Sequence, residues 1–505
     1  MATLRFIFTY YNYINRGQAS MKNTDIKLIL ALIPIIFLVS SCREPEVDPV
    51  ADGNDGEQVI TNPIFTDAEV NTWIHTKMKE YYLWEDDMNG LDDSDLSLSP
   101  DAYFESLLVE PGDIDRFSWI QESSEELRNS LNGVSTIFGF KYKPFYANPE
   151  RSRIAYAITY SLNNSAAANS GIKRGDFITK VNGQDLTSDT YRTALNTETA
   201  TFTMGTYDGG VISDTETSIA VTKEETKAEA LQYYTILELD DKKIGYFVYN
   251  QFLTSSDQAV NNMFGEFKSA AIDELVVDFR YNPGGYISSA EVISSLIVKD
   301  LNSNNLMTKQ IWNEEQMAKR NSGDLDTFFL TSKSGLGTLN NPGTLDRVYF
   351  LVSNGSASAS ELVINNLKPH MDVVLVGEHT YGKSVGSITI DDSNSPQRWA
   401  WGMQPIVLRS VNSIGEADYG TKDGFLPDIE ITDNRLPFVP FGDPQERILG
   451  AALEHMLGSE VLAKARKGSK TIATSEFEAA SNIAVYGNHM MDRPEMWITE
   501  FPWEK

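Results

Sequence analysis

The chain has 505 residues and a formal net charge of −29, and 41% of its residues are apolar. This apolar content suffices for sizeable cores, which excludes a wholly disordered chain, and the length predicts about three domains. The acidic balance argues against binding of nucleic acid, whose phosphates need Lys and Arg. The single Cys excludes an intrachain disulfide and a Cys-based zinc cluster, and the five His lack His-x-x-x-His spacing. We therefore expect neither a metal site nor a cofactor.

The first 62 residues predict a secretory signal followed by a tether. Lys22 and Lys27 precede the apolar run 28–39, and small residues lead from this run to Cys42. This order is typical of a signal peptide, and the run is shorter than the roughly 20 apolar residues that span a bilayer. The segment that ends at Cys42 resembles the bacterial lipobox, in which the Cys is lipidated, and the acidic stretch after it is typical of Bacteroidetes-type lipoproteins. The resemblance implies a lipid-anchored envelope protein, at the outer membrane, facing the periplasm or the cell surface.

The next segment, 63–135, is predicted to be mostly helical. Thr66 and Glu69 form a capping box, and apolar residues then recur at helical spacing. The acidic stretch 85–101 begins like a calcium-binding loop, but Leu96 stands where that loop needs a bidentate Glu. A solvated loop is therefore the preferred interpretation.

Residues 136–222 predict a small β-domain, with strands at 136–142, 153–160, 177–181 and 201–207 and a helical turn at 165–170. The string from Ser165 to Ile178, an Ala-rich turn followed by Gly-Ile and Gly-Asp-x-Ile, resembles a PDZ domain. The resemblance implies that the backbone amides of Phe138, Gly139 and Phe140 hold the C-terminal carboxylate of a peptide. A plain β-domain is the alternative, because Gly-Asp is also a generic turn signal.

Residues 223–467 alternate between apolar strands and helices, which favours an α/β core. The strands are expected at 244–249, 274–280, 348–352 and 373–376, and the helices at 257–271, 288–297 and 357–367. Residues 301–346 look like an insertion or lid. The predicted organisation is a multidomain α/β protein with these parts: signal segment 1–42, acidic tether 43–62, helical region 63–135, β-domain 136–222, core 223–467 and extension 468–505.

Three segments of the core carry chemistry. A strand ends in Asn-Pro-Gly-Gly at 282–285, where glycines can expose backbone N–H groups to an oxyanion. Ser358 starts a predicted helix, where the helix dipole favours negative charge, although it could simply cap that helix with Glu361. Residues 377–384 match the P-loop pattern, but the β-branched stretch 385–390 follows in place of the helix that a P-loop needs, so no nucleotide is expected.

Taken in order, the three segments resemble the carboxy-terminal processing serine peptidases, or tail-specific proteases, and their tricorn-core relatives, over residues 63–467. The resemblance implies a crotonase-like α/β serine protease core with Ser358 as nucleophile and Lys383 as general base. It also implies an oxyanion hole formed by the amides of Ala359 and of Gly284 or Gly285.

Two features bear on the base. Many members carry Gln four positions after the Lys, where this chain has Ser387, so Ser387 is the candidate for orienting Lys383. A Lys with its reference pKa of about 10.4 is protonated at pH 7, so a basic role requires a desolvated amine. His379 is a minor alternative base, since the sequence shows no triad pattern.

The sequence thus predicts a serine endopeptidase with a Ser–Lys dyad that cleaves envelope or extracellular proteins selected by their free C-termini. The alternative is a catalytically silent PDZ adaptor that only binds peptide tails.

Overall fold

The computed structural model describes residues 65–321, 323–467, 472–480, 495–499 and 501. The predicted signal segment, Cys42 and the tether lie outside these residues and stay predictions. No helix within the described ranges is long and apolar enough to cross a membrane.

The N-terminal part is helical, as predicted, and consists of α4 (Asp67–Tyr81), α5 (Pro100–Ser106) and α6 (Ser124–Leu131). The capping box is confirmed, since the Thr66 amide donates to Glu69 and the Glu69 amide donates to the Thr66 hydroxyl. The acidic loop contains two 3-10 turns, η1 (Glu85–Asp87) and η2 (Leu91–Asp93).

A twisted antiparallel sheet follows, with the strand order β3 (Phe140–Tyr146), β4 (Ile154–Ser161), β5 (Phe177–Val181), β7 (Thr199–Asp208) and β8 (Val211–Thr222). Two short elements join it, β6 (Gln184–Asp185) beside β5 and the helix α7 (Ala166–Asn169). The single strand predicted at 136–142 is divided into β2 (Val134–Ile137) and β3, because Gly139 turns the chain at φ +90°. Strand β2 pairs instead with β9 (Glu224–Lys227).

The core contains a six-stranded sheet in the order β10 (Leu231–Leu239), β11 (Lys242–Tyr249), β12 (Glu274–Asp278), β18 (Arg347–Val352), β19 (Asp372–Gly377) and β24 (Ile429–Glu430). It is parallel from β11 to β24. Alternate residues of its strands belong to two separate buried clusters, as expected for a sheet covered on both faces.

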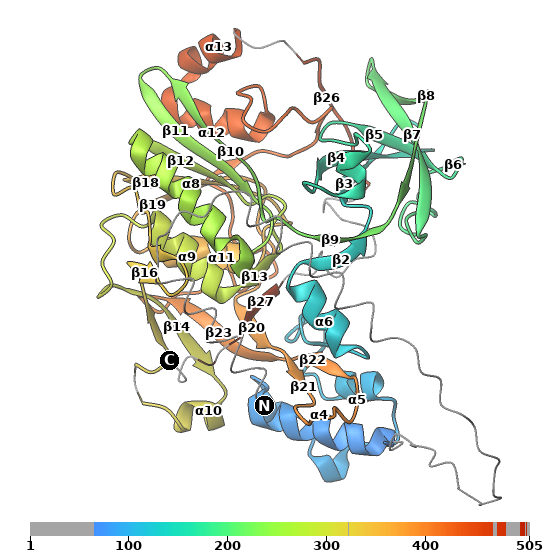
Figure 1. The fold of residues 1–505 in the computed structure, drawn as a ribbon, viewed down its shortest axis with the longest axis vertical. Helices are drawn as coiled ribbons and strands as arrows, with labels where there is room; N and C mark the ends of the chain where they lie inside the picture. The colour runs from blue at the N-terminus through green and yellow to red at the C-terminus, as the bar shows by residue number, and fades with distance from the viewer. Residues whose placement is uncertain (1–64, 322, 468–471, 481–494, 500, 502–505) are drawn as a thin grey trace, which may run out of the picture. The chain divides into compact units, whose positions relative to one another are not determined.

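Helices cover the two faces of this sheet. One cluster includes side chains of α8 (Asp257–Ala270), α9 (Ile287–Ile297) and α11 (Ala359–Leu367), which lie together in Figure 1. The other includes side chains of α12 (Arg447–Leu457) and α13 (Ser459–Lys467). The predicted mixed α/β class is therefore confirmed.

A second six-stranded sheet lies beside the first and has the order β13 (Gly284–Tyr286), β27 (Glu495–Ile498), β20 (Val385–Ile388), β23 (Ile406–Asn412), β14 (Leu306–Trp312) and β15 (Asp326–Phe328). The segment 301–346, expected to be an insertion, supplies two of these strands. The smaller elements are η3 (Thr254–Ser256), α10 (Glu314–Ala318), the pair β16 (Ser332–Lys333) and β17 (Gly337–Thr338), the sheet β1 (Trp119–Gln121), β22 (Gly402–Gln404) and β21 (Ile390–Asp391), and the pair β25 (Arg435–Leu436) and β26 (Ser475–Glu476).

Candidate active site

Ser358 is the most unusual residue of the core. It precedes α11 with φ +63° and ψ −110°, a backbone conformation that costs a non-glycine residue about 1–3 kcal/mol. Its side chain is 0% exposed and its Oγ has no hydrogen-bond partner among the described residues. Buried hydroxyls are almost always paired, so a strained backbone with an unpaired hydroxyl indicates a site kept for chemistry.

The Gly-rich strand end lies directly against the Ser358 turn. The Asn282 carbonyl accepts hydrogen bonds from the Ala357 amide (3.1 Å) and the Ser360 hydroxyl (3.0 Å). The Asn282 side chain accepts from the Gly284 amide at 2.9 Å. Of the two predicted oxyanion glycines, Gly284 donates its N–H within the turn itself, whereas Gly285 faces the paired strand β27. We take Gly285 as the candidate donor, because a peptide in place of β27 would meet its N–H.

Gly285 tolerates no side chain. Its φ is +139°, and an added Cβ would lie 2.3 Å from the Phe252 carbonyl oxygen. A glycine is therefore required for β13 to approach its neighbour this closely.

Glu361 joins the two predicted catalytic segments. Its Oε2 accepts the backbone N–H of Ser358 at 2.7 Å and that of Lys383 at 2.9 Å. Its Oε1 accepts the Thr380 hydroxyl at 2.5 Å and the Gly382 amide at 2.8 Å. The sequence showed Glu361 only as a helix-cap partner, whereas in the structure this carboxyl is the acceptor that holds the Ser and Lys segments together.

Burial raises the pKa of Glu361 to about 7, and the hydrogen bonds from Thr380, Lys383, Ser358 and Gly382 partly oppose that rise. A pKa raised above the ordinary 4.5 means that the folded protein holds this proton more tightly than the unfolded chain does. Stability from Glu361 protonation is therefore complete below about pH 4.5 and is lost as the pH rises through about 7. The four donors favour the ionised carboxylate, which only accepts hydrogen bonds, but burial outweighs them and the pKa of Glu361 stays raised.

Lys383 is 0% exposed, as its predicted role requires. Its Nζ lies 4.8 Å from the centre of the Phe117 ring, and the Arg116 guanidinium donates to the Gly382 carbonyl at 3.2 Å. The segment before β1 thus covers the Lys383 side chain. Phe117 carried no signal in the sequence, because a single aromatic residue in a loop has no pattern.

Three further predictions concern the surroundings of Lys383. Strand β20 follows it directly, so the helix that a P-loop needs is not there. His379 is exposed, and its Nδ1 lies 2.9 Å from the Thr380 carbonyl oxygen, an arrangement that does not favour it as the base. Ser387 is buried, but its Oγ donates to the carbonyl of Met496 in β27 at 3.3 Å.

A buried ionic cluster fixes the backbone just before the Gly-rich strand end. Both oxygens of Asp278 accept from the Arg280 guanidinium, at 2.9 and 2.7 Å, and Glu446 accepts from the same group at 2.9 Å. Arg174 of the β-domain donates to the Tyr281 hydroxyl at 3.2 Å. The β-domain and the site are thus connected through buried charge-assisted hydrogen bonds.

The carboxylate loop, meaning residues 138–140 that are predicted to hold a peptide C-terminus, lies at the start of β3. The Phe138 carbonyl accepts from the Ala167 amide, and the Gly139 carbonyl accepts from the Leu162 amide and the Ser165 hydroxyl. Because C=O and N–H of a trans peptide point in opposite directions, the N–H groups of Gly139 and Phe140 point away from α7 and β4. Two neighbouring amides in this orientation can receive a carboxylate.

Glu361→Gln is expected to lower kcat/KM about 10- to 100-fold and the free energy of unfolding by about 1–3 kcal/mol. The amide nitrogen must face at least one backbone N–H, which leaves a buried donor unpaired. Urea unfolding and peptide hydrolysis measure the two effects. Glu378→Gln is the matched control, because that carboxyl pairs with Lys143 at 3.9 Å instead. Parental kinetics in Glu361→Gln would contradict the role given to Glu361.

Known proteins resemble this chain in sequence and in fold. Residues 243–431 match the model of peptidase family S41, and residues 69–119 match the Peptidase S41 N-terminal domain. A carboxy-terminal-processing protease of Bartonella bacilliformis is 26% identical over 272 residues, which are 52% of this chain and 55% of that protein. The chain thus spans about half the length of this curated relative.

Two further matches are longer. A carboxyl-terminal-processing protease of a Picosynechococcus species is 22% identical over 69% of this chain and 77% of its own. The crystal structure of a Bacteroides fragilis protein assigned to the S41 proteases superposes with a TM-score of 0.64 and 23% identity, over 82% of this chain and 99% of that one. This last similarity concerns the fold.

Proposed function

Because the chain belongs to peptidase family S41, the family of C-terminal processing proteases, we propose that it is a serine endopeptidase with Ser358 as nucleophile and Lys383 as general base. The observation that carries the proposal is the Ser358 hydroxyl, which is buried at a strained turn and has no hydrogen-bond partner among the described residues. The shared acceptor oxygen of Glu361 keeps the Ser358 and Lys383 backbones next to each other.

The reaction follows from the chemistry of these groups. The neutral Lys383 amine takes the proton of Ser358 Oγ as this oxygen bonds to the substrate carbonyl carbon. The amides of Gly285 and Ala359 stabilise the oxyanion, and the Lys383 ammonium then protonates the departing amine as the peptide bond breaks. Water, deprotonated by Lys383, hydrolyses the acyl-enzyme and releases the second product.

We further propose that the sheet β3–β8 selects substrates as a PDZ domain does. Strand β3 is the outer strand of that sheet, so a peptide can add to its edge. The amides of Gly139 and Phe140 would receive the terminal carboxylate. Envelope or extracellular substrates follow from the signal predicted at 28–42 and stay a prediction.

A peptide with a free apolar C-terminus is expected to be cleaved with a KM about 10-fold lower than the same peptide amidated. Amidation removes the charge that strengthens hydrogen bonds from the loop amides, worth about 1.5 kcal/mol. Steady-state hydrolysis of the two peptides measures the difference. Equal KM values would argue against carboxylate capture.

The adaptor alternative rests on Ser387, which replaces the Gln expected after the lysine and binds β27 in this structure. A silent adaptor would bind the free peptide more tightly than the amidated one and cleave neither. Measuring binding and hydrolysis on the same two peptides separates the enzyme from the adaptor.

A further inference from the structure

Strand β27 lies where the second sheet would otherwise be open. It pairs in parallel with β13 on one side, with Gly285 opposite Met496, and with β20 on the other, with Ser387 opposite Trp497. Strand β13 joins this sheet through β27. The space between β13 and β20 is thus one strand wide, about 10 Å across.

The polar groups of the candidate oxyanion glycine face this strand. The Gly284 carbonyl accepts from the Phe252 amide, and the Tyr286 amide donates to the Phe252 carbonyl. Successive residues of a strand point their N–H and C=O groups to opposite sides, so those of Gly285 point to the β27 side. A peptide lying in the place of β27 would therefore meet the Gly285 amide, next to the Ser358 turn.

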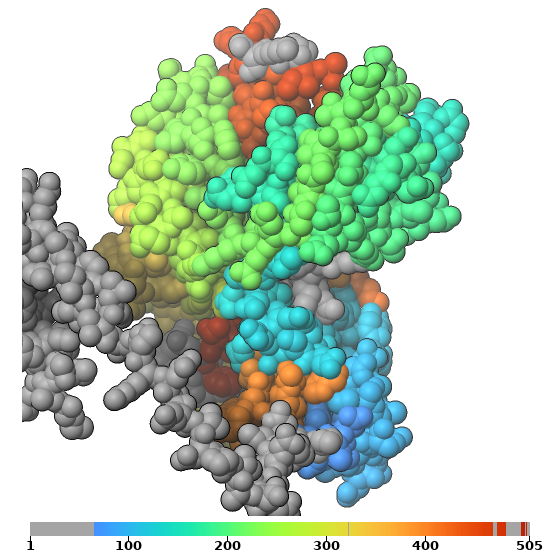
Figure 2. All heavy atoms as spheres, turned by 45° about the vertical axis from the view of Figure 1, so that its right-hand side comes forward, coloured from blue at the N-terminus to red at the C-terminus, as the bar shows by residue number. Residues whose placement is uncertain are grey.

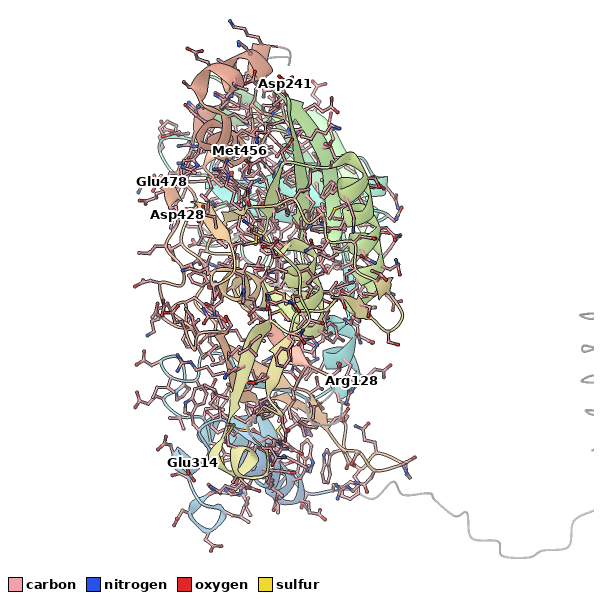
Figure 3. All side chains as sticks on the ribbon, turned by 90° about the vertical axis from the view of Figure 1, so that its left-hand side faces the viewer. Arg128, Asp241, Glu314, Asp428, Met456 and Glu478 are labelled. Carbon is pink, nitrogen blue, oxygen red and sulfur yellow. The ribbon has the colours of Figure 1, made fainter. Side chains whose placement is uncertain are left out.

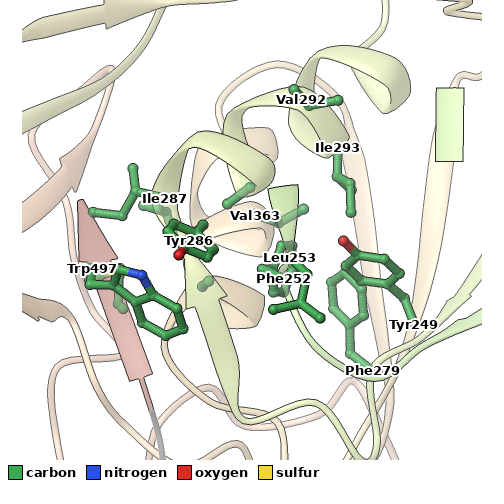
Figure 4. Close-up of a cluster of buried hydrophobic side chains, with 14 of the residues drawn as sticks. Tyr249, Phe252, Leu253, Phe279, Tyr286, Ile287, Val292, Ile293, Val363 and Trp497 are labelled. Atoms are coloured by element: carbon green, nitrogen blue, oxygen red, sulfur yellow. The ribbon is translucent and has the colours of Figure 1, made fainter. Parts of the chain in front are cut away.

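The side chains of β27 are held firmly. Met496 and Trp497 are almost fully buried, and the Trp497 ring lies 4.6 Å from that of Tyr286, centre to centre. Figure 4 shows Trp497 beside Tyr286 and Ile287. In Figure 2 the dark red end of the coloured chain reaches the surface next to the cyan atoms. The position that β27 occupies thus accepts bulky apolar side chains.

A cavity of about 670 Å³ adjoins the end of β27 and is lined by Ile287, Glu291, Lys333, Ile498 and Thr499, among others. It gives room for residues that continue beyond the strand. A longer peptide could therefore pass through the same position without refolding of the core.

An earlier part of the same extension pairs with the edge of β3. Ala479 forms an antiparallel bridge with Phe145, the Tyr146 amide donates to the Glu478 carbonyl at 3.0 Å, and the Ala480 amide donates to Pro144 at 2.9 Å. Glu478 is labelled in Figure 3. A peptide continuing in this direction along β3 would run toward Phe140, where the carboxylate loop begins.

We propose that two segments of the extension, 475–480 and 495–498, occupy the peptide path of the protease from within the same chain. Residues 475–480 take the outer edge of β3, and β27 takes the position of an extended substrate segment with bulky apolar side chains between β13 and β20. The inference rests on the proposed peptidase function. Substrate must displace β27. The apparent affinity for substrate therefore equals the intrinsic affinity multiplied by the fraction of molecules in which β27 has left its position.

A reversible disulfide that holds β27 in place tests whether substrate must displace this strand. Ile388 and Ile498 are register partners, and neighbouring strands lie about 4.8 Å apart, within the range that a disulfide bridges. In the full chain with Cys42→Ser, the pair Ile388→Cys and Ile498→Cys is expected to lose at least about 10-fold in peptide hydrolysis on oxidation and to regain it on reduction. Equal turnover in the oxidised and reduced forms would overturn the proposal.

Two controls complete the experiment. Lys309→Cys with Asp326→Cys, register partners in the same sheet away from β27, should be equally active when oxidised or reduced. Trp497→Asp, with folding checked by circular dichroism, should lower KM about 10-fold with kcat retained, whereas a raised KM or a lost kcat in the folded variant would show β27 to be purely structural. If the parental protein and every reduced variant hydrolyse no peptide, the peptidase function fails, and not the occupancy of the path alone.

Discussion

Ser358→Ala is expected to abolish peptide cleavage, by about 10⁵-fold or more, while the protein keeps its fold. Removing a catalytic nucleophile leaves only binding and oxyanion stabilisation. The Ser358 hydroxyl is buried and has no hydrogen-bond partner in the part of the chain that the structure describes. Losing such a group does not destabilise a core, so we expect the free energy of unfolding to stay equal or rise by about 1 kcal/mol. Hydrolysis assays and urea unfolding on one preparation measure both effects.

Two neighbouring serines provide the controls. Ser356 donates to the Phe279 carbonyl at 2.8 Å and Ser360 to the Asn282 carbonyl at 3.0 Å, so each has a structural partner. Their Ala variants should lose about 1 kcal/mol of stability and retain most of the activity. Full activity in Ser358→Ala would rule out this residue as the nucleophile.

Lys383→Arg is expected to be inactive, with a loss of at least about 10³-fold, although the charge is retained. A guanidinium stays protonated in proteins and cannot accept the Ser358 proton. The Lys383 side chain is fully buried, which meets the condition that the proposed base be shielded from water. The activity of the parental protein should therefore rise with pH along a limb that Lys383 variants lack.

The matched control is Lys368→Arg. Its amine lies 4.8 Å from the centre of the Phe425 ring, the same distance as that of Lys383 from Phe117, but it follows α11 outside the site. This variant should keep parental turnover. If Lys383→Arg also kept it, the base would have to be another group, His379 first among them.

Local patterns predicted most of the core. Strand β5 occupies the predicted residues 177–181, and α8 and α9 begin or end within one residue of the predicted bounds. Each of these elements carries its own hydrophobic period and its own end signals. Strand β27 could not be predicted in this way, because four residues pair with strands more than 100 positions earlier. The position of β27 depends on the space between β13 and β20, which exists only in the folded core.

The site divides along the same line. Ser358, Lys383 and the two glycines stand in sequence motifs, and the residue types in these motifs predict the proposed roles. The roles of Glu361 and Phe117 arise from contacts with Lys383 that bridge distant parts of the sequence. Glu361 lies 22 residues before Lys383, and Phe117 lies much farther from it along the chain. The Ser387 hydroxyl donates to the Met496 carbonyl, a contact that no local pattern in the sequence indicates, and its role toward Lys383 stays a prediction.

Covalent labelling with a serine-reactive phosphonate probe tests the central claim most directly. The parental protein is incubated with the probe, digested and mapped by mass spectrometry, beside Ser358→Ala and Lys383→Arg. The account predicts one labelled site, Ser358, with no label in Ser358→Ala and slow labelling in Lys383→Arg. A Ser358 that stays unlabelled in the folded parental protein, or labelling at the same rate in Lys383→Arg, would contradict the Ser–Lys mechanism.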